Sequence, residues 1–311
     1  MASDLTLTTN SPTRQHFWFR EPSISSLSAI LSAGDAKMAK QARRAIDREG
    51  LGMLKNRDYG PVTATFFEPP VSALDMAVTL DPSKLLHVTH SACGLTIAVV
   101  SIYRLREFDS DDLAVITGRN LSITEAAHMA TVWPSRRRLE WLAGRLAAKS
   151  AVRAFLRMRI GVIREPTEIA VHVVGDGLCA GKPYVEVGGG VGISHSDDFA
   201  IAACTSGPVG IDLERNRRLA PSLEEAMGVA TTLGMQTMPV ALRWACTEAV
   251  LKHFGFGLRV DPREVSLTSW RSDGRFRWRP GPQLRHAIAA MPLPARAWAG
   301  EIAGYSLALV W

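Results

Sequence analysis

Residues 199–214, FAIAACTSGPVGIDLE, combine two apolar runs with a Gly-Pro turn and two acidic residues. The apolar runs predict strands at Phe199–Cys204 and Val209–Leu213, because runs of this length and composition suit buried strands. The four residues between them, 205–208, predict a hairpin turn. Successive residues of a strand point to opposite faces, so Asp212 and Glu214 should share one face.

Two neighbouring carboxylates repel one another unless a cation lies between them. A hard divalent ion such as Mg²⁺ takes oxygen ligands, and it commonly binds one or two carboxylates together with substrate phosphates. Asp212 and Glu214 are therefore candidate metal ligands. An exposed strand with ordinary acidic residues explains the same short pattern, and taken alone it is the more common case.

Elements on both sides of this stretch can be placed from apolar periodicity. Helices are predicted at Arg136–Leu156 and at Val240–Phe254, the second ended by Gly255. Ser122 and Glu125 form a capping-box pair that opens another helix. Strands are predicted at Leu95–Leu105, Ile169–Val174, Arg296–Ile302 and Tyr305–Val310. Asp109–Asp112 is expected to form an acidic loop, and Ser23–Asp47 a helix.

Glu248 and Lys252 lie four residues apart within the predicted helix 240–254, so their side chains share a face. A surface ion pair is the simpler explanation of this spacing. A third carboxylate directed at a metal, with a lysine beside it for phosphate, is the functional alternative.

Two short segments offer groups for binding phosphate. In Ser194-His195-Ser196 the histidine stands between hydroxyl residues just before a strand, where it either donates to a phosphate or stabilises a turn. In Gly181-Lys182-Pro183 the lysine sits in a proline-stiffened turn, and an ordinary surface loop explains it equally well. A Ser-His-Asp hydrolase receives little support, because the chain has no G-x-S-x-G.

Composition excludes several classes of protein. The chain has 311 residues, of which 47% are hydrophobic and 21% charged, so it has enough apolar side chains for a folded core. The sequence has no run of about 18 consecutive apolar residues, so a membrane-spanning helix is not predicted. The N-terminal residues do not have the pattern of a secretory signal. The four cysteines are far apart, which favours free thiols in the cytoplasm over zinc sites or disulfides.

The net charge of +6 suits phosphate-bearing ligands or acidic protein partners. Nucleic acid is not indicated, because the basic residues do not interleave with aromatic ones.

The order of these segments resembles 4′-phosphopantetheinyl transferases of the larger, surfactin-synthetase-activating type. That family has G-K-P, then S-H-S, then G-I-D-x-E, then W-x-x-K-E-(A/S)-x-x-K, preceded by R-R-x-E-(F/W)-x-x-G-R. The resemblance covers about residues 90–311, and several motifs in fixed order are more specific than any single one. The matching segments here are Arg137–Arg145, Gly181–Pro183, Ser194–Ser196, Gly210–Glu214 and Trp244–Lys252, with a closing match at Gly304–Ala308.

The resemblance implies an enzyme, a holo-[acyl-carrier-protein] synthase, that moves the phosphopantetheine arm of coenzyme A to a serine of an acyl or peptidyl carrier protein. It implies Mg²⁺ held by Asp212, Glu214 and Glu248, with Glu248 also the base for the serine proton. It implies that Lys252 contacts the transferring phosphate. It also implies that His195 takes part in catalysis. The side chains that it implies as further ligands of coenzyme A are Ser194, His195, Lys182, Arg137 and Arg145.

The fold that the resemblance implies is α+β (α/β), with two similar halves about a pseudo-twofold axis and the site between them. The halves would span residues 86–207 and 208–311, after an N-terminal extension, residues 1–85, whose role the sequence does not indicate. Two fused halves favour a monomer. An acidic carrier protein would suit the basic charge of this chain.

One position departs from the family pattern: Thr247 stands where the family has a lysine. The departure removes a charge-assisted contact worth about 1–3 kcal/mol, so we expect either weaker activity or compensation by a nearby arginine such as Arg243. Two alternatives therefore stay open beside an active transferase. One is the same fold turned to other chemistry on carrier-bound intermediates, and the other is a non-catalytic module that binds coenzyme A or a carrier protein.

Overall fold

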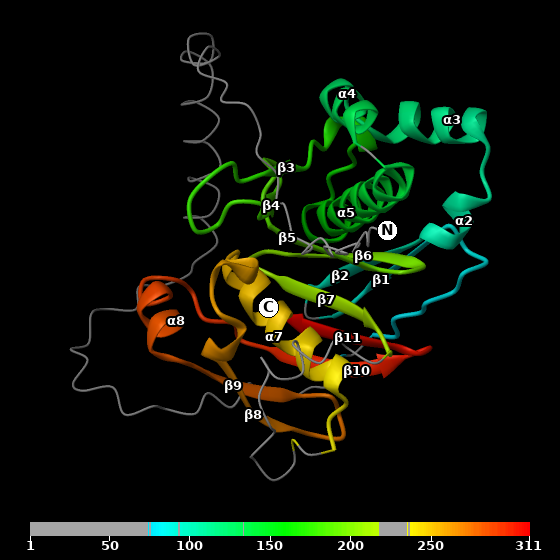
Figure 1. The fold of residues 1–311 in the computed structure, drawn as a ribbon. Coiled ribbons are helices and arrows are strands. Elements are labelled where there is room, and N and C mark those ends of the chain that lie inside the picture. The colour runs from blue at the N-terminus through cyan, green and yellow to red at the C-terminus, as the bar shows by residue number, and fades with distance from the viewer. Residues whose placement is uncertain (1–73, 75, 93, 133, 218–234, 236) are drawn as a thin grey trace, which may run out of the picture. The chain divides into compact units, whose positions relative to one another are not determined.

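The computed structural model describes residues 74, 76–92, 94–132, 134–217, 235 and 237–311, all within one compact unit, Phe66–Trp311. Helices and antiparallel strands alternate in an α+β arrangement (Figure 1). The helix predicted at Ser23–Asp47 and most of the N-terminal extension lie outside the described residues.

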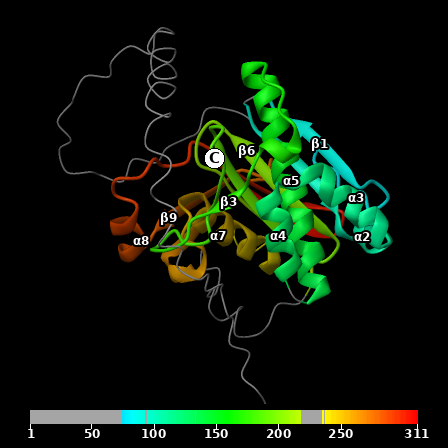
Figure 2. The same ribbon diagram turned by 90° about the horizontal axis from the view of Figure 1, so that it is seen from above.

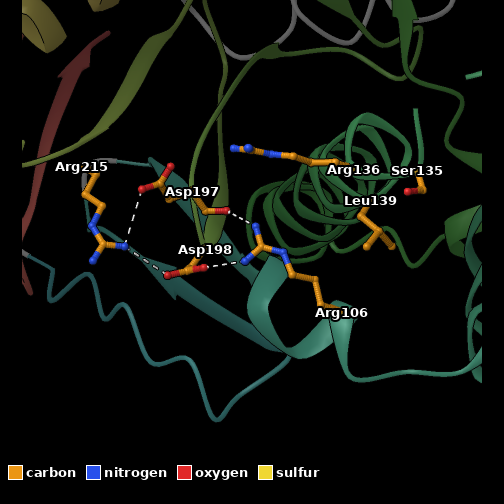
Figure 3. Close-up of a pocket in the computed structure, with 7 residues that line it drawn as sticks. All are labelled: Arg106, Ser135, Arg136, Leu139, Asp197, Asp198 and Arg215. Carbon is orange, nitrogen blue, oxygen red and sulfur yellow. Dashed lines mark hydrogen bonds and ion pairs between the residues drawn. The ribbon is translucent and has the colours of Figure 1, made fainter. Parts of the chain in front are cut away.

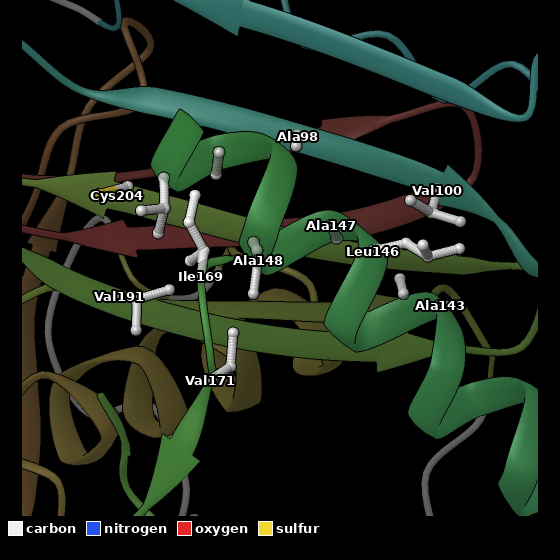
Figure 4. Close-up of a cluster of buried hydrophobic side chains, with 14 of the residues drawn as sticks. Ala98, Val100, Ala143, Leu146, Ala147, Ala148, Ile169, Val171, Val191 and Cys204 are labelled. Atoms are coloured by element: carbon white, nitrogen blue, oxygen red, sulfur yellow. The ribbon is translucent and has the colours of Figure 1, made fainter. Parts of the chain in front are cut away.

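The first sheet has the strand order β1-β2-β6-β5, and every neighbouring pair is antiparallel. Its strands are β1 (Leu86–His90), β2 (Thr96–Ser101), β5 (Gly190–Ser196) and β6 (Phe199–Thr205). Helix α5 (Ser135–Ile160) lies across one face of this sheet, as Figure 2 shows from above. The side of α5 that meets the sheet is rich in alanine, which lets the helix approach the strands closely (Figure 4).

The second sheet has the order β10-β11-β7, also antiparallel throughout. It consists of β7 (Gly210–Arg215), β10 (Ala297–Ile302) and β11 (Tyr305–Val310). Helix α7 (Val240–Phe254) covers one face of it and ends at Gly255, whose φ of 86° suits a residue without a side chain.

The two sheets pack face to face between the two helices. Along β6, residues 199, 201 and 203 face the second sheet, whereas residues 200, 202 and 204 face α5. On β11, residues 305, 307 and 309 join the shared core, and residues 308 and 310 face α7. Both strands are apolar throughout because both of their faces are buried.

The same connection pattern occurs in each sheet. In the first, the chain runs from β2 through α5 to β5 and β6, and the last strand, β6, lies in the middle as β2-β6-β5. In the second it runs from β7 through α7 to β10 and β11, and the last strand again lies in the middle as β7-β11-β10.

Smaller elements fill the edges of these layers. They are α2 (Ile102–Arg106), α3 (Ser110–Asn120), α4 (Ile123–Thr131), α8 (Pro282–Ala287), the paired strands β3 (His172–Val173) and β4 (Pro183–Tyr184), and the paired strands β8 (Val265–Trp270) and β9 (Phe276–Pro280). The capping box predicted at Ser122 and Glu125 is present at the start of α4.

Four local predictions were wrong in detail. The strand predicted at Leu95–Leu105 stops at Ser101, because the Ser101 hydroxyl accepts a hydrogen bond from the Arg104 amide and opens α2. The predicted acidic loop begins a helix instead, since the Asp109 carboxylate caps α3 by accepting from the amides of residues 111 and 112. The strand predicted at Ile169–Val174 is reduced to its residues 172 and 173.

The predicted hairpin between β6 and β7 is the fourth error. Strand β6 is already paired on one side with β2 and on the other with β5, so it has no free edge for β7. Residues 206–209 therefore carry the chain across to the second sheet, where β7 pairs with β11.

Candidate functional site

The first sheet, the second sheet and α7 meet along strand β7, where the three predicted acidic residues lie. Asp212 and Glu214 are on the face of β7 that is turned toward α7, and Glu248 lies on α7 itself. Close packing of β7 on α7 depends on Gly210, because a Cβ there would overlap the Ala249 carbonyl. The glycine that opens G-I-D-L-E thus sets the distance between strand and helix.

Asp212 has the most buried carboxylate of this group, with 2% of its side chain exposed. Its Oδ1 accepts hydrogen bonds from the Lys252 ammonium at 2.5 Å and from the Ser194 hydroxyl at 2.8 Å. Its Oδ2 is buried and has no hydrogen-bond partner. A buried carboxylate oxygen without a partner is costly, so this oxygen is suited to accept a ligand.

Lys252 joins the strand and the helix electrostatically. Its Nζ lies 2.5 Å from Asp212 Oδ1, 3.2 Å from Glu248 Oε2 and 3.3 Å from Ser194 Oγ. Desolvation acts to lower the pKa of Lys252, but the charges of Asp212 and Glu248 outweigh it and hold that pKa well above its ordinary value. The ammonium is therefore charged at neutral pH.

The other two carboxyls are held in their protonated form more strongly than usual. Desolvation raises the pKa of Glu248, and the charge of Asp212 adds to this effect against the opposing effect of Lys252. Desolvation, followed by repulsion from Asp212 and Glu248, raises the pKa of Glu214 to about 8. Ionising both glutamates would place more negative charge here than Lys252 balances, and an added cation would favour that ionisation.

Strand β5 holds its serines against β7. Ser194 Oγ accepts from the Leu213 amide at 3.2 Å, and Ser196 Oγ accepts from the Arg215 amide at 3.0 Å. Because residues two apart on a strand share a face, His195 between them points the other way and is exposed. The hydroxyls of S-H-S therefore join the two sheets, and Ser194 reaches the site through Asp212.

His195 lies within electrostatic reach of both Glu140 on α5 and Lys252 on α7. Desolvation by its surroundings lowers its pKa, although Glu140 opposes that effect. The ring is exposed and lies at the rim of the site. An exposed ring there is accessible to a ligand.

Lys182 lies at the C-terminal end of α7. Its Nζ is 3.5 Å from the His253 carbonyl oxygen, and its methylene chain fills the space beside Gly255. Desolvation lowers the pKa of this lysine. Its charge complements the last carbonyls of the helix, which is a structural role that sequence reasoning did not consider.

The two arginines predicted to bind a nucleotide phosphate lie in different surroundings on α5. Arg137 is exposed near the start of the helix. Arg145 is 12% exposed, with its guanidinium 4.9 Å from the Trp141 ring centre and 4.0 Å from a Glu125 oxygen. Glu125 also forms a 2.6 Å ion pair with the buried Lys149. The structure therefore places Arg145 within a buried polar cluster between α4 and α5.

Sequence reasoning missed a pocket beside this site. It has a volume of about 540 Å³ and lies between the start of α5 and the turn after β5 (Figure 3). Its lining residues are Arg106, Ser135, Arg136, Leu139, Asp197, Asp198 and Arg215. Its arginines are paired with acids, as in the 2.7 Å contact of Arg106 with Asp198. The adjacent acids of the 196–199 turn were the available sequence signal.

The donor set suits a divalent cation in part. Asp212 and Glu248 both contact the Lys252 ammonium, so a cation at that point would meet two carboxylates, and Asp212 Oδ2 offers a further oxygen. Within the described residues, however, no group of three or more histidine, cysteine, aspartate or glutamate side chains is arranged to hold a metal ion. Lys252 fills the point where two of the carboxylates meet.

Thr247, the residue that departs from the motif pattern, is 4% exposed within α7. Models of known protein families do not match this chain, and a search of curated proteins also gave no match. In the part of the chain that the structure describes, no helix combines the length and apolar character needed to span a membrane.

Proposed function

We propose that this protein is a Mg²⁺-dependent 4′-phosphopantetheinyl transferase that acts on an acyl or peptidyl carrier protein. One observation carries the proposal. A buried carboxylate with an unpartnered oxygen, Asp212, stands beside Glu214 and opposite Glu248 and Lys252, on a strand and a helix that are distant in sequence. Phosphoryl transfer needs positioning and charge neutralisation, and this arrangement supplies groups for both.

The repeated connection pattern supports the same proposal. In each sheet three strands follow the same pattern, a strand, a helix and then two strands with the last in the middle, and the first sheet has β1 as an additional edge strand. Two such units packed face to face are what the expected pseudo-twofold fold of residues 86–207 and 208–311 requires. Strand β7 then opens the second half and presents its carboxylates at the junction with β5 of the first half.

The proposed reaction breaks the pyrophosphate of coenzyme A. A carrier serine oxygen forms a bond to the phosphorus that bears the pantetheine arm, and 3′,5′-ADP leaves with the bridging oxygen. Bound Mg²⁺ would be held by Asp212, Glu248 and Glu214, where it would neutralise charge on the pyrophosphate.

The side chains of this chain supply the remaining functions. Glu248 accepts the serine proton as the general base. Lys252 donates to the phosphate that is transferred. The coenzyme A phosphates would be bound at the rim by His195 and Arg137, with Lys182 beside α7, and an acidic carrier protein would approach a chain of net charge +6.

One observation favours a second candidate. The contact of Lys252 with Asp212 and Glu248 satisfies two carboxylates without a metal, as would suit a module that binds coenzyme A or a carrier protein without chemistry. Mass spectrometry separates the two after incubation with coenzyme A, Mg²⁺ and an apo carrier protein. The transferase adds one phosphopantetheine to the carrier, whereas the binding module leaves its mass unchanged.

Matched variants then test the assigned base. Glu248→Gln keeps the size of the side chain and should abolish transfer, because an amide neither accepts the serine proton nor binds a cation well. Glu186→Gln, at a side chain that is 80% exposed, makes the same chemical change elsewhere and should leave transfer intact. Full transfer by Glu248→Gln would remove Glu248 from the mechanism.

A further inference from the structure

Lys252 occupies the point that a metal ion would need. An ammonium has three N–H donors, and here the three nearest acceptors are Asp212 at 2.5 Å, Glu248 at 3.2 Å and Ser194 at 3.3 Å. Mg²⁺ needs oxygen ligands at about 2.0–2.1 Å. The ammonium and a divalent cation therefore exclude each other between these carboxylates, both by volume and by charge.

Lys252 is also the member of this cluster best able to move. Its side chain is 27% exposed, compared with 2% for Asp212 and 17% for Glu248. It has a flexible four-carbon chain, whereas the Asp212 carboxylate is fixed by the Ser194 hydroxyl at 2.8 Å. If the Lys252 side chain turns toward solvent, it leaves the point between the carboxylates, provided that another anion pairs with its ammonium.

We infer that Lys252 is a resident counter-ion that holds the cation position between Asp212 and Glu248 until a ligand phosphate draws its ammonium away. The inference rests on the proposed function, because it takes coenzyme A as the source of that phosphate. It predicts that metal alone binds weakly and that coenzyme A and metal strengthen each other's binding. That coupling must be reciprocal, since it is an equilibrium property.

A permanent ion pair is the competing explanation. In that case Lys252 only fastens α7 to β7, and its removal leaves two carboxylates that attract any cation more strongly. Both explanations therefore predict that a neutral residue at position 252 improves metal binding in the absence of ligand. They differ in whether the effect of coenzyme A on metal affinity depends on Lys252.

Mn²⁺ binding tests the inference without using transfer activity. Free Mn²⁺ is titrated by electron paramagnetic resonance against wild type, Lys252→Met and Lys252→Gln, each with and without coenzyme A. We expect the neutral variants to bind Mn²⁺ at least about tenfold more tightly than wild type when coenzyme A is absent. Lys84→Met removes an exposed lysine that is paired with Asp81, and it should bind Mn²⁺ as wild type does.

The Mn²⁺ titrations in the presence of coenzyme A decide between the explanations. We expect coenzyme A to raise the Mn²⁺ affinity of wild type by a factor at least about tenfold larger than in the neutral variants, where no lysine has to move. Equal factors in wild type and variants would overturn the inference, as would neutral variants that bind Mn²⁺ no more tightly than wild type.

Two provisions keep the test conclusive. Lys252→Gln retains N–H donors for Asp212, so it should fold even if Lys252→Met does not. If neither folds, wild type alone can still refute the inference, because it does so if coenzyme A leaves the Mn²⁺ affinity unchanged. Failure of the proposed function is recognised separately, by an unmodified carrier protein alongside the predicted Mn²⁺ affinities.

Discussion

Glu214 gives the metal-free protein a specific dependence of stability on pH. Its pKa is raised from 4.5 to about 8, first by desolvation and then by the charges of Asp212 and Glu248. The unfolded chain loses this proton near the ordinary pKa, so between about pH 4.5 and pH 8 the folded state binds more protons. The free energy of unfolding therefore falls as pH rises through this range, and the contribution is constant above it.

The size of this effect follows from the two pKa values. A carboxyl that changes from 4.5 to about 8 on folding corresponds to about 5 kcal/mol at most. Glu214 is only partly buried, so water screens some of the repulsion, and we expect about 1–3 kcal/mol. Glu214→Gln has no charge to lose, so at pH 8 it should be more stable than wild type by this amount. At pH 4.5 the two should be nearly equal.

Urea unfolding at pH 5, 6, 7 and 8 in the presence of a chelator measures the effect, with tryptophan fluorescence as the signal. Other groups titrate over the same range, so the informative quantity is the difference between wild type and variant at each pH. Glu186→Gln serves as the control, because its side chain is 80% exposed and the difference should stay near zero. Parallel curves for wild type and Glu214→Gln would refute the reasoning.

Four further substitutions test how the site is supported. Gly210→Ala should destabilise the protein by about 2–4 kcal/mol in urea unfolding, because its Cβ overlaps the Ala249 carbonyl; an unchanged midpoint would show that β7 can move away from α7. Arg145→Met should lower the Tm more than Arg137→Met does, while calorimetry should show the larger loss of coenzyme A affinity for Arg137→Met; the reverse order would return Arg145 to the binding site. Thr247→Lys should cost about 2–4 kcal/mol in urea unfolding, because it places an ammonium at a position that is 4% exposed, and unchanged stability would mean that the new side chain reaches water.

Much of the fold could be predicted where periodicity is simple. Helix α7 spans the predicted residues 240–254, and β11 spans the predicted 305–310. The errors come from positions where one residue has two local options. Ser101 lies within an apolar stretch and Asp109 opens an acidic one. Whether their side chains cap helices depends on tertiary packing that a short pattern does not contain.

The path of the chain between sheets was harder to foresee. A Gly-Pro turn between two apolar strands predicts a hairpin, and the turn chemistry gives no hint that β6 already has partners on both sides. Those partners, β2 and β5, come from residues 96–101 and 190–196. Pairing between strands that are distant in sequence follows from competition for edges, which local propensity does not describe.

The site shows the same division between local and distant information. Strand periodicity placed Asp212 and Glu214 on one face, and helix periodicity placed Glu248 beside Lys252, as the 3.2 Å contact between the last two confirms. Neither period could indicate that Lys252 lies closer to Asp212, 40 residues away, than to Glu248 in its own helix. That contact exists because Gly210 lets α7 approach β7, and because Ser194 fixes the Asp212 carboxylate from a third element.

The position of Lys252 is therefore the least predictable feature of the site and the one on which the proposed chemistry depends. An ammonium between Asp212 and Glu248 makes the cluster stable without metal, whereas an ammonium turned to a phosphate leaves it short of positive charge. If the inference about Lys252 holds, the cluster has two arrangements, one with the ammonium between the carboxylates and one with a cation in its place. On the proposed function, which arrangement is populated should depend on the phosphate ligand, and the cation would then bind once coenzyme A is already in place.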